Sequence, residues 1–90
     1  MPNDIAYSRT YATSLLKGVQ ILNLFTREKS EWRVGEMSKK IGAAKSTVSR
    51  IARTLESEGY LQRIQGREGY RLGLRLWELG EIALYDQSEF

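Results

Sequence analysis

The sequence contains no cysteine, no histidine and no long run of apolar residues. The lack of cysteine excludes disulfide scaffolds, thiolate metal sites and cysteine nucleophiles. The lack of histidine removes the commonest metal ligand and the commonest general base, so only carboxylate or lysine chemistry remains for an enzyme. No segment approaches the roughly 18 apolar residues that span a bilayer, and the N-terminus lacks the basic and apolar regions of a signal peptide. We therefore expect a cytoplasmic protein with no catalytic activity, no cofactor and no membrane partner.

What is present is the composition of an ordinary globular chain. Its 90 residues have a mass of 10.3 kDa, and 41% of them are hydrophobic and 28% charged. Domains typically hold about 100 to 150 residues, so the chain has room for one small domain with a modest core and no second fold.

The charges are distributed unevenly along the chain, although their sum is only +3. The segment 38–55 has five basic residues and no acid, and the segment 62–75 has four arginines against Glu68 alone. The segment 76–90 reverses the sign, with four acids and no basic residue: Glu78, Glu81, Asp86 and Glu89. Without histidine or cysteine partners, these acids indicate a solvated helix end rather than a metal site. The first two segments favour contact with a polyanion, and the last would avoid one.

The first half of the chain predicts a flexible arm, two helices and a very short strand. Residues 1–13 show no period and are interpreted as a flexible N-terminal arm. Apolar residues then recur every three or four positions, which predicts a helix from Ser14, its cap, to about Arg27. A short strand is expected at 32–34. Gly35 and Gly42 bracket a second helix of under two turns, with Gly35 as its N-cap.

The second half predicts a third helix, a hairpin and a fourth helix. Two residues after Gly42, apolar positions return at i, i+3, i+4 and i+7, in a helix that Gly59 closes. The spacing of side chains then changes to the alternation of a β-strand, in which Leu61 and Arg63 point one way and Gln62 and Ile64 the other. The segment 65–69 is the expected hairpin tip, and 70–72 the second strand. From residue 74 a fourth helix has an apolar band too broad for one small core, so part of it is expected to face a partner.

This order of elements is that of a winged helix-turn-helix. The fold class is therefore expected to be mainly α with a small β-hairpin, followed by a linker helix. The third helix carries hydroxyls and arginines at 46, 49, 50 and 53, which advance along one face and could reach base edges or phosphates in a major groove. Lys45, Ser46 and Thr47 at its start are suited to anchor a phosphate. Arg67 at the hairpin tip would reach a neighbouring groove or the backbone.

Several segments resemble the N-terminal domain of the IclR-type transcriptional regulators, and the similarity runs from about 14 to 85. They are SLLKG (14–18), IL (21–22), KSTVSR (45–50), LESEGYL (55–61) and YRLG (70–73). Two positions depart from the family pattern: Ala43-Ala44 replaces an apolar residue and proline, and Gly35 replaces a Ser or Thr cap.

The resemblance implies a winged helix-turn-helix domain at 14–73 and a linker or dimerisation helix at 74–90. It implies a homodimer, formed through the first helix, the fourth helix and the N-terminal arm, that binds a palindromic DNA operator. The effector-sensing C-terminal domain of the family is absent from this chain, which is either a fragment of a longer repressor or activator or a short relative without a sensor. The implied DNA-binding residues are Lys45, Ser46, Thr47, Ser49, Arg50 and Arg53 on the recognition helix and Arg67 and Arg71 on the wing.

Other functions fit the sequence less well. A winged-helix module that binds only proteins would not need a basic third helix. The segment 43–47 echoes the end of a phosphate-binding P-loop but has Ala44 and Lys39 where that motif needs glycine. The segment 66–69 matches the GXXG loop of KH domains, but it joins strands rather than helices. Trp32, Tyr60 and Trp77 are interpreted as packing residues, because they are not interleaved as base-stacking platforms require.

Overall fold

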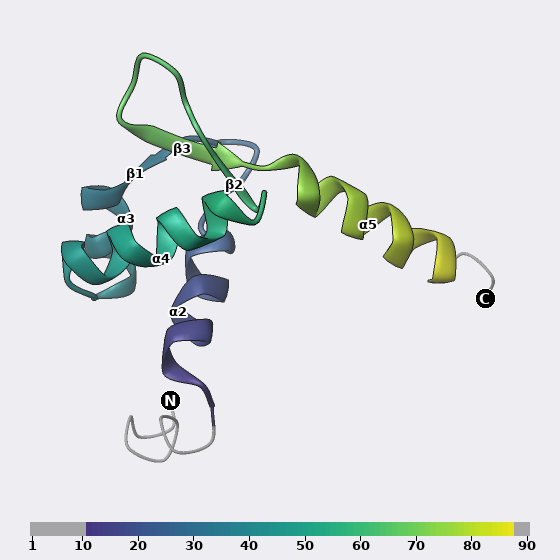
Figure 1. The fold of residues 1–90 in the computed structure, drawn as a ribbon, viewed down its shortest axis with the longest axis horizontal. Coiled ribbons are helices and arrows are strands. Elements are labelled where there is room, and N and C mark those ends of the chain that lie inside the picture. The colour runs from purple at the N-terminus through teal and green to yellow at the C-terminus, as the bar shows by residue number, and fades with distance from the viewer. Residues whose placement is uncertain (1–10, 88–90) are drawn as a thin grey trace.

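The computed structural model describes residues 11–87, which form four helices and three short strands (Figure 1). In chain order these elements are α2 (Thr13–Leu22), β1 (Trp32–Arg33), α3 (Val34–Ile41), α4 (Lys45–Ser57), β2 (Leu61–Arg63), β3 (Gly69–Leu72) and α5 (Leu74–Gln87). The fold is mainly helical with a small antiparallel sheet, the winged helix-turn-helix predicted from the sequence. Of the expected N-terminal arm, residues 1–10 lie outside the described residues.

Helix α2 is shorter than its apolar pattern predicts. Ala12, not Ser14, is its N-cap, and the helix ends at Leu22 rather than near Arg27. The next backbone amides form tighter turns, with 3.1 Å between Leu24 N and the carbonyl oxygen of Ile21. Leu24 and Phe25 nevertheless pack against the core. The helical spacing of the apolar residues therefore predicted correctly which side chains pack against the core, but it predicted too long a helix.

Helices α3 and α4 are joined by a turn of three residues, 42–44. Gly42 has φ +70°, the left-handed conformation that favours glycine, and its N–H donates to the carbonyl of Ser38 at 3.0 Å. The predicted end of α3 is therefore confirmed. Its predicted start at Gly35 is wrong, because the N-cap is Arg33 and Gly35 lies inside the first turn.

The sheet has the strand order β1-β3-β2, and both pairs are antiparallel. The predicted hairpin is confirmed as β2 and β3, with Leu61 opposite Leu72 and Arg63 opposite Tyr70. The predicted short strand forms β1, which adds Trp32 beside Tyr70 on the other side of β3. The chain between β2 and β3 extends away from the helices as the wing, residues 64–68 (Figure 1).

The core lies between the three helices α2, α3 and α4 and one face of the sheet. Its buried members come from every one of these elements and are Ile21, Trp32, Met37, Val48, Ala52, Leu61 and Tyr70. Trp32 thus packs as predicted, and Tyr60 is half-buried. Trp77 does not, because its side chain is 65% exposed on α5.

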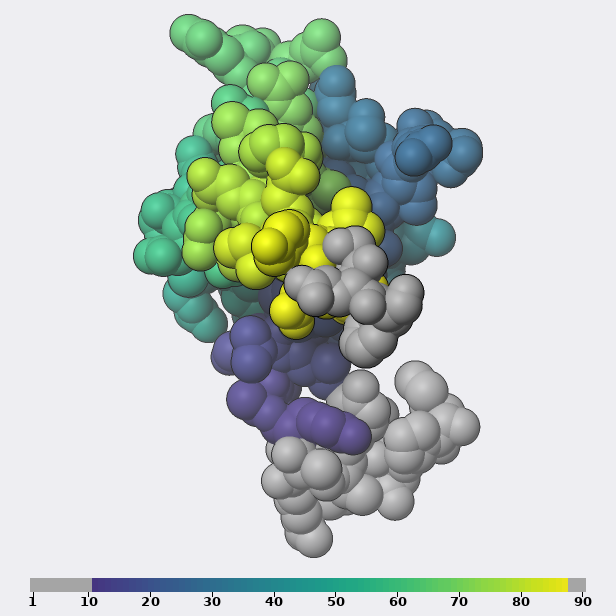
Figure 2. Space-filling model, turned by 90° about the vertical axis from the view of Figure 1, so that its right-hand side faces the viewer, coloured from purple at the N-terminus to yellow at the C-terminus, as the bar shows by residue number. Residues whose placement is uncertain are grey.

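Helix α5 leaves the body of the molecule (Figure 1) and faces the viewer in Figure 2. None of its residues is buried. Two backbone hydrogen bonds join its start to the turn between α4 and β2: Gly73 N donates to the Tyr60 carbonyl at 2.9 Å, and Arg75 N to the Gly59 carbonyl at 3.1 Å. None of the helices described is both long and apolar enough to cross a membrane.

Candidate nucleic-acid interface

Helix α4 presents one fully exposed polar stripe. Val48 and Ala52 point into the core, so the residues opposite them on the helix face solvent. The stripe consists of Ser46, Arg50 and Arg53, which follow one another at i, i+4 and i+7, and all three are exposed. Short hydroxyls and long arginines at this spacing lie along a line about 10 Å long, which suits the floor of a major groove.

The other predicted residues of α4 lie on its two flanks. Lys45 and Ser49 face the wing, where they line a cleft with Arg63. Thr47 is half-buried and lies on the opposite flank. Arg50 also borders a shallow apolar pocket between α4 and the N-terminal half of α2, next to Leu15. The six predicted residues therefore share one helix but do not share one surface.

The cations of α4 are not neutralised within the part of the chain that the structure describes. Lys45, Arg50 and Arg53 form no ion pair with residues 11–87. The three ion pairs in this part of the chain use cations elsewhere: Lys29 with Glu36, Arg67 with Glu31 and Arg75 with Glu78. The positive charge of α4 is thus available to a polyanion.

The two predicted wing residues differ in their surroundings. Arg67 forms an ion pair with Glu31, with 2.8 Å between Nη1 and Oε1, and both side chains are largely exposed. Arg71 lies on the outer face of the sheet, where its Nε donates to Oε1 of Gln62 at 3.1 Å. It lines a pocket with Phe25 and Ser30, away from α4. The structure therefore does not bring Arg71 to the same surface as Lys45 and Ser49.

Arg63 was missed as a candidate site residue. It lies opposite Tyr70 in the sheet, with its guanidinium 5.5 Å from the centre of the Tyr70 ring and Nη1 donating to the Tyr70 hydroxyl at 3.1 Å. The signal was present in the alternation of β2, which places Arg63 on the same side as the core residue Leu61. A charged side chain on the core-facing side of a strand is expected at the edge of the core, where its charged end reaches solvent next to the helices.

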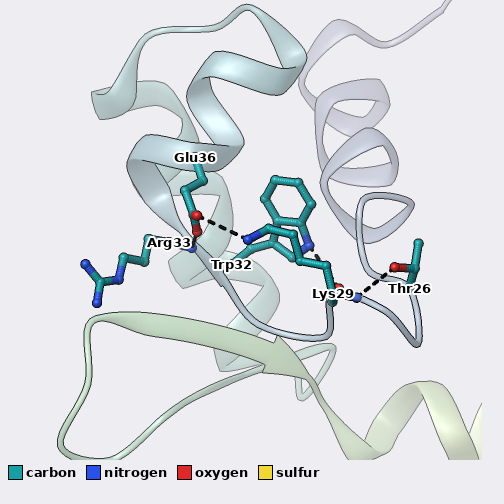
Figure 3. A network of polar contacts seen from close by, with 5 residues as sticks. All are labelled: Thr26, Lys29, Trp32, Arg33 and Glu36. Carbon is teal, nitrogen blue, oxygen red and sulfur yellow. Dashed lines mark hydrogen bonds and ion pairs between the residues drawn. The ribbon is translucent and has the colours of Figure 1, made fainter.

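A polar network holds the start of α3 and orients the residues around it (Figure 3). Oε1 of Glu36 accepts from the backbone N–H of Arg33 at 2.9 Å, and Oε2 pairs with Nζ of Lys29 at 3.1 Å. That backbone hydrogen bond first, and the Lys29 ammonium second, lower the pKa of the Glu36 carboxyl below its ordinary value. Lys29 Nζ also lies 4.5 Å from the centre of the Trp32 ring, and Trp32 Nε1 donates to the Lys29 carbonyl at 3.2 Å. The helix that supports α4 is thus anchored to the core.

The surface of residues 11–87 is marked by the basic helix α4 and by the wing. No group of three or more His, Cys, Asp or Glu residues within 11–87 is arranged to hold a metal ion. The backbone N–H of Arg33, the partner that lowers the pKa of Glu36 most, belongs to the cap of α3. The features that remain are a basic recognition helix and a wing.

Comparison with known proteins agrees with this geometry. Residues 14–65 match the IclR helix-turn-helix domain. The chain is 34% identical over 71 residues to the HTH-type transcriptional regulator XynR of Escherichia coli K12, covering 79% of this chain and 28% of XynR. It is 39% identical over 72 residues to the HTH-type transcriptional regulator KdgR of Dickeya chrysanthemi, covering 80% of this chain and 23% of KdgR.

Among solved structures, an IclR family transcriptional regulator from Brucella abortus is similar with a TM-score of 0.80 and 30% identity, covering 94% of this chain and 31% of that protein. The chain thus spans less than a third of the length of each of these relatives. These proteins are described as transcriptional regulators, and a helix-turn-helix domain is a DNA-binding motif. The chain belongs to the IclR family of transcriptional regulators and carries its helix-turn-helix domain.

Proposed function

We propose that the chain reads a specific double-stranded DNA operator through the exposed stripe of α4. The observation that carries the proposal is the stripe itself, Ser46, Arg50 and Arg53, with unpaired arginines on a helix that the fold presents outward. Arg50 and Arg53 would contact base edges or phosphates in the major groove, and Lys45, Ser46, Thr47 and Ser49 would fix the helix on the DNA backbone. Arg67 would contact the backbone or a neighbouring groove from the wing. For Arg71, on the outer face of the sheet, we propose a contact at the edge of the wing only.

We propose further that the DNA-bound form is a homodimer on a palindromic site. Two apolar surfaces support this. On α5, Leu74, Trp77 and Ile82 are each more than 60% exposed, and on α2 Leu15 is 69% exposed. A monomer rarely leaves so many large apolar side chains in water without a partner for them. Two copies joined through α2, α5 and the N-terminal arm would place their recognition helices in successive major grooves, roughly 34 Å apart.

In this scheme residues 14–73 form the DNA-binding domain, and 74–90 form a linker and dimerisation helix. If a C-terminal effector domain follows in a longer protein, a small molecule bound there would act through α5. A role on operator DNA would place the protein in the bacterial cytoplasm.

The test is selection from a randomised duplex pool, repeated at two salt concentrations. Enrichment of an inverted repeat, with affinity falling steeply as salt rises, is the expected result. Enrichment of a single half-site would retain DNA reading and overturn the dimer. No enrichment and no salt dependence would overturn the proposal in favour of a module that binds only proteins.

A further inference from the structure

A cleft of about 490 Å³ lies between the start of α3, the flank of α4 and the wing, beside the proposed recognition stripe. Four cationic side chains from four elements line it: Arg33, Lys39, Lys45 and Arg63. Two acids also line it, Glu36 and Glu68. Glu36 is already paired with Lys29 and with the backbone of Arg33. The four cations of the cleft therefore face one acid, Glu68, that forms no ion pair with residues 11–87.

The contacts of two of these cations show where their side chains lie in the cleft. A Cβ atom at Gly35 would lie 3.5 Å from Cε and 3.8 Å from Nζ of Lys45. Lys45 therefore extends back across the first turn of α3, and its ammonium lies over the one position there that has no side chain. Arg63 is fixed by the hydroxyl and the ring of Tyr70, which is itself 1% exposed. A guanidinium fixed in this way loses less entropy on binding than a free one.

The remaining two cations come from the end of β1 and from α3. The guanidinium of Arg33 extends away from the capping network that holds its backbone (Figure 3). Lys39 follows it one turn and a half later on α3, and neither side chain forms an ion pair with residues 11–87. The cleft thus gathers two ammonium and two guanidinium groups from four elements around one polar space, and such groups together recognise a tetrahedral oxyanion.

We propose that this cleft binds a phosphate group, and that on operator DNA it holds one backbone phosphate beside the major groove that α4 enters. The assignment of that phosphate to DNA rests on the proposed function. Arg63 is the central residue, because its guanidinium is held by Tyr70 on the wing side of the cleft that Lys45 lines from α4. Glu68 opposes binding, since its carboxylate lies on the same rim.

The test compares Arg63→Gln with Arg27→Gln, a matched loss of charge in the loop on the outer side of the sheet. Arg63→Gln should weaken binding to every duplex alike, by about tenfold, and lower the slope of affinity against salt by about one. Arg27→Gln should change affinity less than about twofold. Arg63→Lys keeps the charge and should keep the salt slope, which separates the contact from the packing of Tyr70. Glu68→Gln should act in the opposite direction and raise affinity.

A second arm separates the sources of phosphate. Inorganic phosphate is titrated into the wild type at constant ionic strength, and the side-chain Nε–Hε signal of Arg63 and the amide of Tyr70 are followed by nuclear magnetic resonance. Shifts that disappear in Arg63→Gln, without any effect of that variant on DNA, would assign the cleft to a free phosphate. Loss of DNA affinity without such shifts would assign it to the backbone.

The proposal is overturned if Arg63→Gln matches Arg27→Gln on DNA and phosphate causes no shift in the wild type. If the wild type binds no duplex at all, the proposed function fails. The phosphate titration alone then shows whether the cleft binds phosphate.

Discussion

Arg67 at the tip of the wing reaches Glu31 in the loop before β1, with 2.8 Å between Nη1 and Oε1 across 36 positions of sequence. The side chains are 63% and 48% exposed, so the pair contributes less than about 1 kcal/mol to the free energy of folding. In the proposed DNA complex the pair would act mainly on binding, because Glu31 engages the cation that the wing would offer to DNA.

Glu31→Gln should therefore strengthen DNA binding several-fold at low salt, with the gain fading as salt rises, because it releases Arg67. Fluorescence anisotropy on one duplex at several salt concentrations measures this. Glu28→Gln, an equal charge change in the same loop, is the control. Equal gains from both variants would show that net charge, rather than the release of Arg67, raises the affinity.

Arg50 and Lys45 should separate base reading from backbone binding. Arg50→Ala on the exposed stripe is expected to cost about 1–3 kcal/mol on the selected site and to relax base preference. Lys45→Ala in the cleft is expected to weaken all sequences alike and to lower the salt slope by about one. Competition between specific and random duplexes gives both quantities. Equal loss of selectivity from the two variants would contradict this division.

The Glu36 carboxyl should make folding stability depend on pH in the acid range. Its pKa is lowered in the folded state, so its stabilising contribution is complete above the unfolded-state pKa and is lost as pH falls through the folded-state pKa. Glu36→Gln removes this contribution. The difference in Tm between the wild type and the variant should thus be present at neutral pH and shrink as pH falls toward 3. A difference that stays constant with pH would assign the effect to packing; Glu81→Gln on α5 is the control.

Gly73 and Gly80 should respond oppositely to alanine. A Cβ at Gly73 would lie 2.1 Å from the carbonyl oxygen of Gly59, so Gly73→Ala must displace the join between the wing and α5. We expect a loss of about 2 kcal/mol or more in the free energy of unfolding. A Cβ at Gly80 meets nothing within 4 Å, and Gly80→Ala should gain up to about 1 kcal/mol of helix stability. Urea unfolding and circular dichroism measure both, and a neutral Gly73→Ala would disprove the close contact.

Trp77 should matter for association and not for the fold of one copy. Since its side chain is 65% exposed and outside the core, Trp77→Ala is expected to weaken the proposed dimer while changing monomer stability by less than about 0.5 kcal/mol. Sedimentation over a range of concentrations separates the two. A fall in monomer stability without a change in association would remove Trp77 from the interface.

The periodic parts of the fold were predictable because burial imposes the pattern directly. Val48 and Ala52 mark the buried face of α4, and Gly42 marks the end of α3, since each reflects a local requirement that neighbouring residues fix. The end of α2 was not predictable in this way. Leu24 and Phe25 continue the apolar spacing and pack against the core, yet they do so from turns. The pattern records which residues are buried, and the backbone can satisfy it in more than one conformation.

The candidate site was predictable as a helix and a hairpin but not as surfaces. The spacing of Ser46, Arg50 and Arg53 gives their common stripe, because one helix determines it. The placement of Lys45 and Arg63 in one cleft, and of Arg67 against Glu31, depends on contacts between segments far apart in sequence. Such contacts follow from the register of the sheet and from the packing of α4 on it, neither of which a local pattern contains.

The hydrogen bonds of Gly73 and Arg75 couple the orientation of α5 to the turn that follows α4. Because α5 starts against the turn that follows α4 and then runs outward with no buried residue, two backbone hydrogen bonds connect a rotation of α5 to the turn at Gly59 and Tyr60. Whatever grips α5, whether a second copy or a domain that continues the chain, would set the angle at which α4 meets the DNA. Small rotations far from the operator would thereby become changes in the distance between two recognition helices.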